Sequence, residues 1–152
     1  MDDVKRILVV SRMTSHCRKA VHYGISLAKK YGAELYFIHC MHNPFVFEWP
    51  LSIPIWVLAE DYKKLLVKNR EDINTVINVE KEKGMKIIEM VKEEDPVEVI
   101  SDIVRDENID LIIMAAHEEG RLEHFLFGRC NDEIIRTMPC SVLLVKAEQR
   151  PV

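Results

Sequence analysis

The chain has 152 residues, 48% of them hydrophobic and 30% charged, a composition that excludes an intrinsically disordered protein and suits one domain over residues 1–152. Its formal net charge of −4 at pH 7, without a basic stripe, argues against nucleic-acid binding. No apolar run is long enough for a membrane span, and the acidic start Met1-Asp2-Asp3 does not resemble a signal peptide, so we expect a cytoplasmic protein.

The first part of the chain alternates strand-like and helix-like segments. An almost continuous apolar run at 5–10 predicts a strand that is covered on both faces. Thr14 or Ser15 can cap a following helix, and Gly32 is a stop signal for it. A second strand is expected at 34–41.

The connection at 43–57 differs from the rest because prolines interrupt a strongly apolar, aromatic stretch. Its prolines and aromatic residues are Pro44, Phe45, Phe47, Trp49, Pro50, Pro54 and Trp56. Two interpretations stay open. The segment folds over the domain's own edge and buries its rings, or it forms a lid or docking surface for a small-molecule or protein partner.

The second part continues the alternation. A long amphipathic helix is expected at 58–83, Gly84 ends it, and a third strand follows at 85–91. Asp95 is a predicted N-cap, because Pro96 then takes the first helical position. The remaining predicted segments are a strand at 110–116, a short helix at 131–137 and a strand at 141–145.

This order predicts an α/β protein, a three-layer α/β/α sandwich with a five-stranded parallel sheet in the order 3-2-1-4-5. The reason is that parallel neighbours need long right-handed crossovers. Ligands of such sheets bind beyond the carboxyl ends of the strands, where the strand order reverses. That crevice lies between the first and fourth strands, and residues 11–14 and 115–119 would line it.

Both ends of the chain resemble the universal stress protein family. The start, KRILVVSRMTSHCRKAVHYGISLAKKYGAELYFIHCMH, is similar to the family's first βαβ unit, including His39 near the end of its second strand. The end, DLIIMAAHEEGRLEHFLFGRCNDEIIRTMPCSVLLVK, is similar to its signature block, most closely at 138–145. The resemblance covers nearly the whole chain. It implies an adenine-nucleotide alpha-hydrolase-like, Rossmann-like fold and a homodimer.

The resemblance also implies a nucleotide site that this chain has altered. ATP-binding members carry G-x2-G-x9-G-[S/T] after the fourth strand, so that backbone N–H groups approach the phosphates. The four corresponding residues here are Ala115, Glu118, Gly128 and Arg129, of which one matches. After the first strand, Arg12 replaces the family's usual Asp. We therefore expect poor ATP binding, and a salt bridge between Arg12 and Glu118 that closes the former phosphate site.

The candidate ligand site comprises the residues expected at this crevice. They are Ser11, Arg12, Met41, Met114, Ala115, His117, Glu118, Gly128, Arg129 and Cys130. No cofactor is expected, with ATP or AMP as the alternative. No catalytic residue is assigned, since nothing positions a base beside Cys130.

Histidines and cysteines near the same rim suggest a weaker alternative. His16, His42 and His117 are candidate metal ligands together with Cys17 and Cys40, although no recognised ligand spacing links them. The leading interpretation of the cysteines is that they are reduced, small buried hydrophobes.

The sequence thus favours a non-enzymatic, cytoplasmic regulatory or binding protein of the stress response. A nucleotide-binding protein with an altered site and a metal- or redox-responsive protein are the alternatives. The last strand would be an exposed apolar edge in a monomer, so it is expected to meet its symmetry mate in a homodimer. This predicted dimer edge consists of Ser141, Val142, Leu143, Leu144 and Val145.

Overall fold

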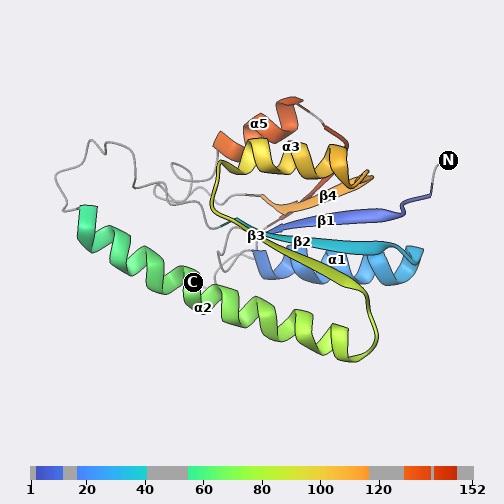
Figure 1. Cartoon of the computed structure of the whole chain (residues 1–152), viewed down its shortest axis with the longest axis horizontal. Helices are drawn as coiled ribbons and strands as arrows, with labels where there is room; N and C mark the ends of the chain where they lie inside the picture. Colours follow the sequence, from blue (N-terminus) through green and yellow to red (C-terminus); the bar gives the residue numbers. More distant parts are fainter. Residues whose placement is uncertain (1–2, 12–16, 41–54, 117–128, 138, 147–152) are drawn as a thin grey trace.

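The computed structural model describes residues 3–11, 17–40, 55–116, 129–137 and 139–146. Strands and helices alternate along the chain (Figure 1). In chain order they are β1 (Arg6–Ser11), α1 (Cys17–Tyr31), β2 (Glu34–Cys40), α2 (Ile55–Glu82), β3 (Ile87–Lys92), α3 (Pro96–Asp106), β4 (Leu111–Ala115), α5 (Arg129–Thr137) and β5 (Ser141–Val145).

The five strands form one sheet in the order β3-β2-β1-β4-β5, and every pairing is parallel. This confirms the predicted order. β1 is central: Val10 pairs with Ile38 of β2 on one side and with Met114 of β4 on the other. The apolar run of β1 follows from this position, because a central strand covered on both faces has no solvent side.

Two apolar layers fill the space between the sheet and its helices. α1 and α2 cover one face of the sheet, and α3 and α5 cover the other (Figure 1). On the first face, Ile7, Val9 and Phe37 of the strands pack with Ile73 and Ile77 of α2 in one cluster. On the second face the cluster combines Leu8, Val10, Tyr36, Ile38, Ile100, Ile103, Ile112, Met114 and Ile134. Odd and even strand positions therefore face different helices, as the two-residue repeat of a strand requires.

Helix ends follow the predicted signals. Gly32, directly after α1, and Gly84, two residues after the end of α2, have φ angles of 63° and 92°, in the left-handed region that favours glycine. Asp95 caps α3, since its Oδ1 accepts a hydrogen bond from the backbone N–H of Val97 at 2.9 Å. Three predicted starts were wrong by two residues or more. α2 begins at Ile55, so the last part of the predicted 43–57 connection is helical, whereas β3 begins at Ile87 instead of 85 and α5 at Arg129 instead of 131. Residues 41–54 lie outside the described part.

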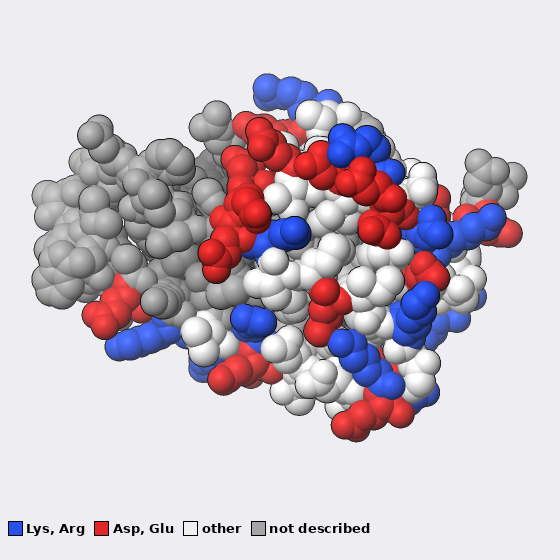
Figure 2. Space-filling view, viewed as in Figure 1, with Lys and Arg blue, Asp and Glu red and all other residues white. Residues whose placement is uncertain are grey.

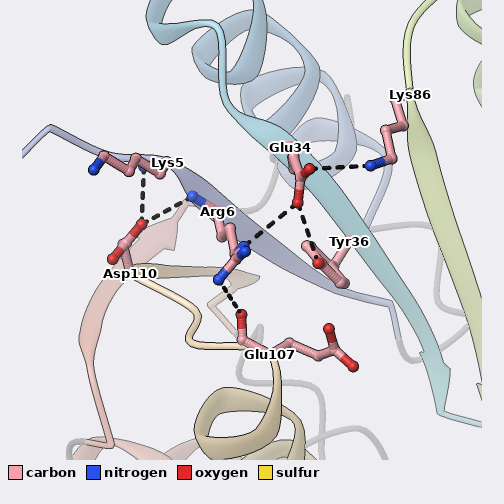
Figure 3. A network of polar contacts seen from close by, with 7 residues as sticks. All are labelled: Lys5, Arg6, Glu34, Tyr36, Lys86, Glu107 and Asp110. Atoms are coloured by element: carbon pink, nitrogen blue, oxygen red, sulfur yellow. Dashed lines mark hydrogen bonds and ion pairs between the residues drawn. The ribbon is translucent and has the colours of Figure 1, made fainter.

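A polar network ties the strands together at the amino edge of the sheet (Figure 3). Glu34 accepts from Arg6 Nε at 3.4 Å and from Lys86 Nζ at 3.0 Å. Asp110 Oδ2 accepts the backbone N–H groups of Lys5 and Arg6 at 2.8 and 2.9 Å. The Lys86 ammonium holds the pKa of Glu34 below its ordinary value. These contacts join the starts of β1, β2, β3 and β4, at the edge opposite the predicted crevice.

Candidate functional site

The crevice predicted from the topology lies at the carboxyl ends of β1 and β4. Val10 and Met114 form the last pair between these two strands, and Ser11 and Ala115 follow them as the final residue of each strand. Ser11 is fully buried and Ala115 is half-buried. The strand order reverses here: β2 and β3 follow β1 on one side of the sheet, and β4 and β5 are then added on its other side. Ser11 and Ala115 are distant in the sequence but therefore lie side by side at the carboxyl edge of the sheet, where ligands of such sheets bind.

The backbone after Ala115 is engaged in the sheet. The N–H of Ala116 donates to the carbonyl of Val145 at 2.8 Å, which extends the β4–β5 pairing past the end of β4. Ala115 also carries a Cβ, which a glycine at this position would lack. Both features limit how closely a bulky anion can approach the backbone at this point.

His39 is the second buried polar residue at this edge, paired with Ser11 across β1 and β2. Its ring lies against that of Phe37, with ring centroids 4.9 Å apart. Nε2 is 3.9 Å from Glu89 Oε1, and within the described part of the chain Nδ1 has no hydrogen-bond partner. Burial lowers the pKa of His39 to about 4, only partly opposed by Glu89. The imidazole is therefore neutral at neutral pH.

Acidic residues follow β3 at the same edge of the sheet. Glu93 and Glu94 come directly after its last residue, Lys92, and both are exposed. Figure 2 shows acidic side chains in a band over the β3–α3 connection and α3. Exposed acidic residues of this stretch are Glu93, Glu94, Asp95, Glu98, Asp102, Asp106 and Glu107. Their field disfavours highly charged anions nearby, to the extent that salt leaves it unscreened.

Comparison with known proteins identifies the family. The model of the universal stress protein family matches residues 3–146. The chain belongs to the universal stress protein family. A universal stress protein of Methanocaldococcus jannaschii is 27% identical over 150 residues, which are 96% of this chain and 84% of that protein.

Solved structures of universal stress proteins share the fold. A second Methanocaldococcus jannaschii member has a TM-score of 0.70 at 20% identity, covering 98% of this chain and 100% of that one. A universal stress protein of Archaeoglobus fulgidus, solved in complex with dAMP, has a TM-score of 0.59 at 13% identity, covering 96% and 100%. Other family structures of this fold hold AMP, in a protein of Arabidopsis thaliana, and cAMP.

Only part of the predicted ligand site of this universal stress protein falls within the described residues. Ser11 and Ala115 lie together at the predicted edge, whereas Met114 is 1% exposed and packs in the α3/α5 core. Arg129 and Cys130 are the first residues of α5, which places their backbone and not their side chains. The other predicted site residues lie outside the described part: Arg12, Met41, His117, Glu118 and Gly128. The expected salt bridge between Arg12 and Glu118 therefore stays a prediction.

The metal alternative finds no support among the residues that the structure describes. No group of three or more His, Cys, Asp or Glu side chains is arranged there for a metal ion. Cys17 belongs to the α1/α2 core and Cys40 to the α3/α5 core, so the sheet separates them. Burial raises the pKa of the Cys140 thiol, which makes it a weaker nucleophile at neutral pH. His16, His42 and His117 lie outside the described residues.

Sequence reasoning missed the polar contact between β2 and β3. Glu89 lies in the middle of β3, where it faces His39 and accepts a hydrogen bond from Lys81 of α2 at 2.9 Å. A signal was present, because Glu89 is a lone acidic residue inside the apolar segment Ile87-Ile88-Glu89-Met90-Val91.

No helix in the described residues has the combination of length and apolar character that a membrane crossing requires.

Proposed function

We propose that this universal stress protein is a non-enzymatic, cytoplasmic regulatory or binding protein of the stress response that binds ATP poorly. The observation that carries the proposal is Ala115, which ends β4 beside the end of β1 at the position of the first motif glycine. Its methyl group stands where the family's ATP-binding members need bare backbone for the phosphates.

Charge supports the same conclusion. Glu118 replaces the second motif glycine, and Glu93 and Glu94 follow β3 at the same edge of the sheet. A triphosphate brings several negative charges, and placing them among carboxylates without matching donors is unfavourable. Arg12 and Arg129 are the nearby cations in the sequence, and we propose that Arg12 pairs with Glu118 rather than with a phosphate.

A nucleoside monophosphate is the second candidate ligand. Family members of this fold have been solved with dAMP, AMP and cAMP, each of which carries one phosphate. A single phosphate needs fewer backbone donors than a triphosphate, and Arg12 or Arg129 could bind it as a charge-assisted donor. This alternative keeps the crevice as a nucleotide site and changes only the ligand.

Isothermal titration calorimetry with ATP and with AMP tests both candidates. We expect a Kd for ATP no tighter than roughly 100 µM, because backbone approach and charge balance are both compromised. A low-micromolar Kd for ATP would overturn the main proposal. A Kd for AMP at least tenfold tighter than that for ATP would favour the second candidate.

A triple variant tests the residues held responsible. Arg12→Asp, Glu118→Gly and Arg129→Ser together restore the family's residues, and we expect ATP affinity to increase measurably. Arg105→Ser is the matched control, since Arg105 lies in the last turn of α3, where the chain returns to the amino edge. ATP binding unchanged in the triple variant would show that these three residues are not the cause of weak binding.

A further inference from the structure

His39 lies between the sheet and α2. It shares its face of β2 with Phe37, whose cluster includes Ile73 and Ile77 of α2. The charges that act on it come from β3 and α2: Glu89 on the strand, and Arg70 and Lys81 on the helix. Its paired residue on β1 is Ser11, whose side chain does not titrate.

The buried imidazole of His39 has few polar contacts with the described residues around it. The 3.9 Å separation of Nε2 and Glu89 Oε1 is longer than a hydrogen bond, and Nδ1 has no hydrogen-bond partner among the residues that the structure describes. Glu89 is already hydrogen-bonded to Lys81 at 2.9 Å. A protonated imidazole here would hold a buried charge with two N–H donors, beside the positive charges of Arg70 and Lys81. Protonation is therefore strongly opposed while α2 stays in place.

Of the elements around His39, α2 is the one most easily moved. β2 is hydrogen-bonded to β1 and to β3 along its whole length. Among the described side chains of α2, the buried apolar ones are Ile73 and Ile77. Among the described side chains, α2 forms the ion pair Lys81–Glu89 with β3 and the ion pairs Arg18–Asp72 and Lys29–Glu80 with α1. Lifting α2 admits water to His39 and breaks no strand pairing.

α2 is longer than the sheet that it covers, so it can separate from the sheet without disturbing the strands. The helix has 28 residues, which is about 42 Å at 1.5 Å per residue, whereas a strand of six residues spans about 20 Å. Its first turns extend beyond the carboxyl edge of the sheet (Figure 1). We propose that His39 is an acid-sensitive latch: when its imidazole gains a proton, α2 is released from β2 and β3.

The expected direction follows from linkage. With α2 docked, the pKa of His39 lies near 4, and in the hydrated, released state it returns to about 6.5. A depressed histidine pKa stabilises the docked form at high pH, and this stabilisation is lost as pH falls below 6.5 and fully gone near pH 4. Between pH 7.5 and pH 5 the ratio of released to docked α2 should increase about 30-fold.

Amide hydrogen exchange, corrected for the intrinsic effect of pH, measures this ratio. In the wild-type protein, amides at 73–80 of α2 should lose about 30-fold in protection between pH 7.5 and pH 5, while amides at 100–104 of α3 change little. Equal loss of protection in α2 and α3 would indicate global unfolding and would overturn the latch. So would a His39 pKa of 6.5 or above in an NMR titration of its ring.

Variants identify the titrating group. His39→Phe keeps an aromatic ring without a titrating nitrogen, and His39→Gln keeps a polar group, so both should remove the pH dependence of α2 exchange. His22→Gln is the matched control, because His22 is exposed on α1 and its loss should leave that dependence intact. A pH dependence that persists in both His39 variants would overturn the proposal. The wild-type comparison of α2 with α3 remains decisive if either variant fails to fold.

Discussion

Gly24 occupies the closest approach between α1 and β1. A Cβ built on it overlaps Cγ2 of Val9, and Leu35 Cδ1 would be 3.6 Å away. Gly24→Ala should therefore lower the free energy of unfolding by about 1–3 kcal/mol, because the core must shift to admit a methyl group. An intrinsic helix preference of up to about 1 kcal/mol for alanine opposes this effect without cancelling it. Urea unfolding followed by circular dichroism measures the difference.

Ser26→Ala provides the control for Gly24→Ala. Ser26 is exposed on the same helix, so its replacement should change the free energy of unfolding by no more than about 0.5 kcal/mol. A more stable Gly24→Ala variant would mean that α1 can move away from β1 at no penalty, contrary to the close contact described.

The sequence was sufficient to predict the positions of some residues of the site but not the contacts of others. Ser11 and Ala115 were predictable, because each ends an apolar run whose strand order was already determined by the βα alternation. The contact between His39 and Glu89 was not, since it depends on the register of β2 against β3 and on where α2 crosses them. Register is set by tertiary contacts, and a short apolar run is compatible with several registers.

At the scale of the element, α3 depends on its N-cap. Asp95 Oδ1 satisfies the backbone N–H of Val97, which otherwise has no partner within the helix. Asp95→Ala should lower the free energy of unfolding by about 1 kcal/mol in urea experiments. Asp95→Asn retains an accepting oxygen and should lose less than half as much. Equal losses in the two variants would show that charge, and not the cap hydrogen bond, is what matters.

The start of α2 shows how one sequence signal supports two structures. The prolines of 43–57 predict a connection without helix that includes Pro54, yet α2 begins at the next residue, Ile55. Proline disrupts a helix interior but is favoured around its first turn, where the missing N–H has no partner to lose. The residues on both sides of Pro54 are apolar, so local composition could not distinguish the end of a loop from the start of a helix.

At the scale of the whole molecule, β5 is an edge strand, and no described strand pairs with its outer side. Leu144 is 43% exposed there. We expect a two-fold homodimer in which β5 meets its symmetry mate, because such an edge is normally paired or covered. Sedimentation velocity at micromolar concentration should give the dimer mass, and Leu144→Lys should shift it to the monomer.

Val79→Lys is the control for the dimer. Val79 is similarly exposed, at 44%, but lies on α2, so this variant should remain a dimer. A wild-type monomer at micromolar concentration would contradict the predicted interface. Dissociation of both variants alike would indicate a general effect of charge and would place the interface elsewhere.

The fold as a whole was predictable because few arrangements satisfy the alternation of strands and helices. Right-handed crossovers and apolar strands such as Ile7–Val10 restrict a five-stranded parallel sheet to a small number of orders, among them the predicted order 3-2-1-4-5. The segments between the carboxyl ends of the strands and the next helices carry most of the predicted site. Their conformation depends on turns and ligands rather than on a repeating pattern, so periodicity provides no comparable constraint.

The central place of β1 has a consequence for the protein as it emerges from the ribosome. β1 can pair with β2 once Cys40 has emerged from the ribosome, but its other partner, β4, is complete only when Ala115 emerges, about 75 residues later. At about 5–20 residues per second, this interval lasts about 4–15 s. Throughout it, the apolar strand from Ile7 to Val10 has one unpaired flank, which makes the nascent chain a substrate for chaperones that bind extended apolar segments.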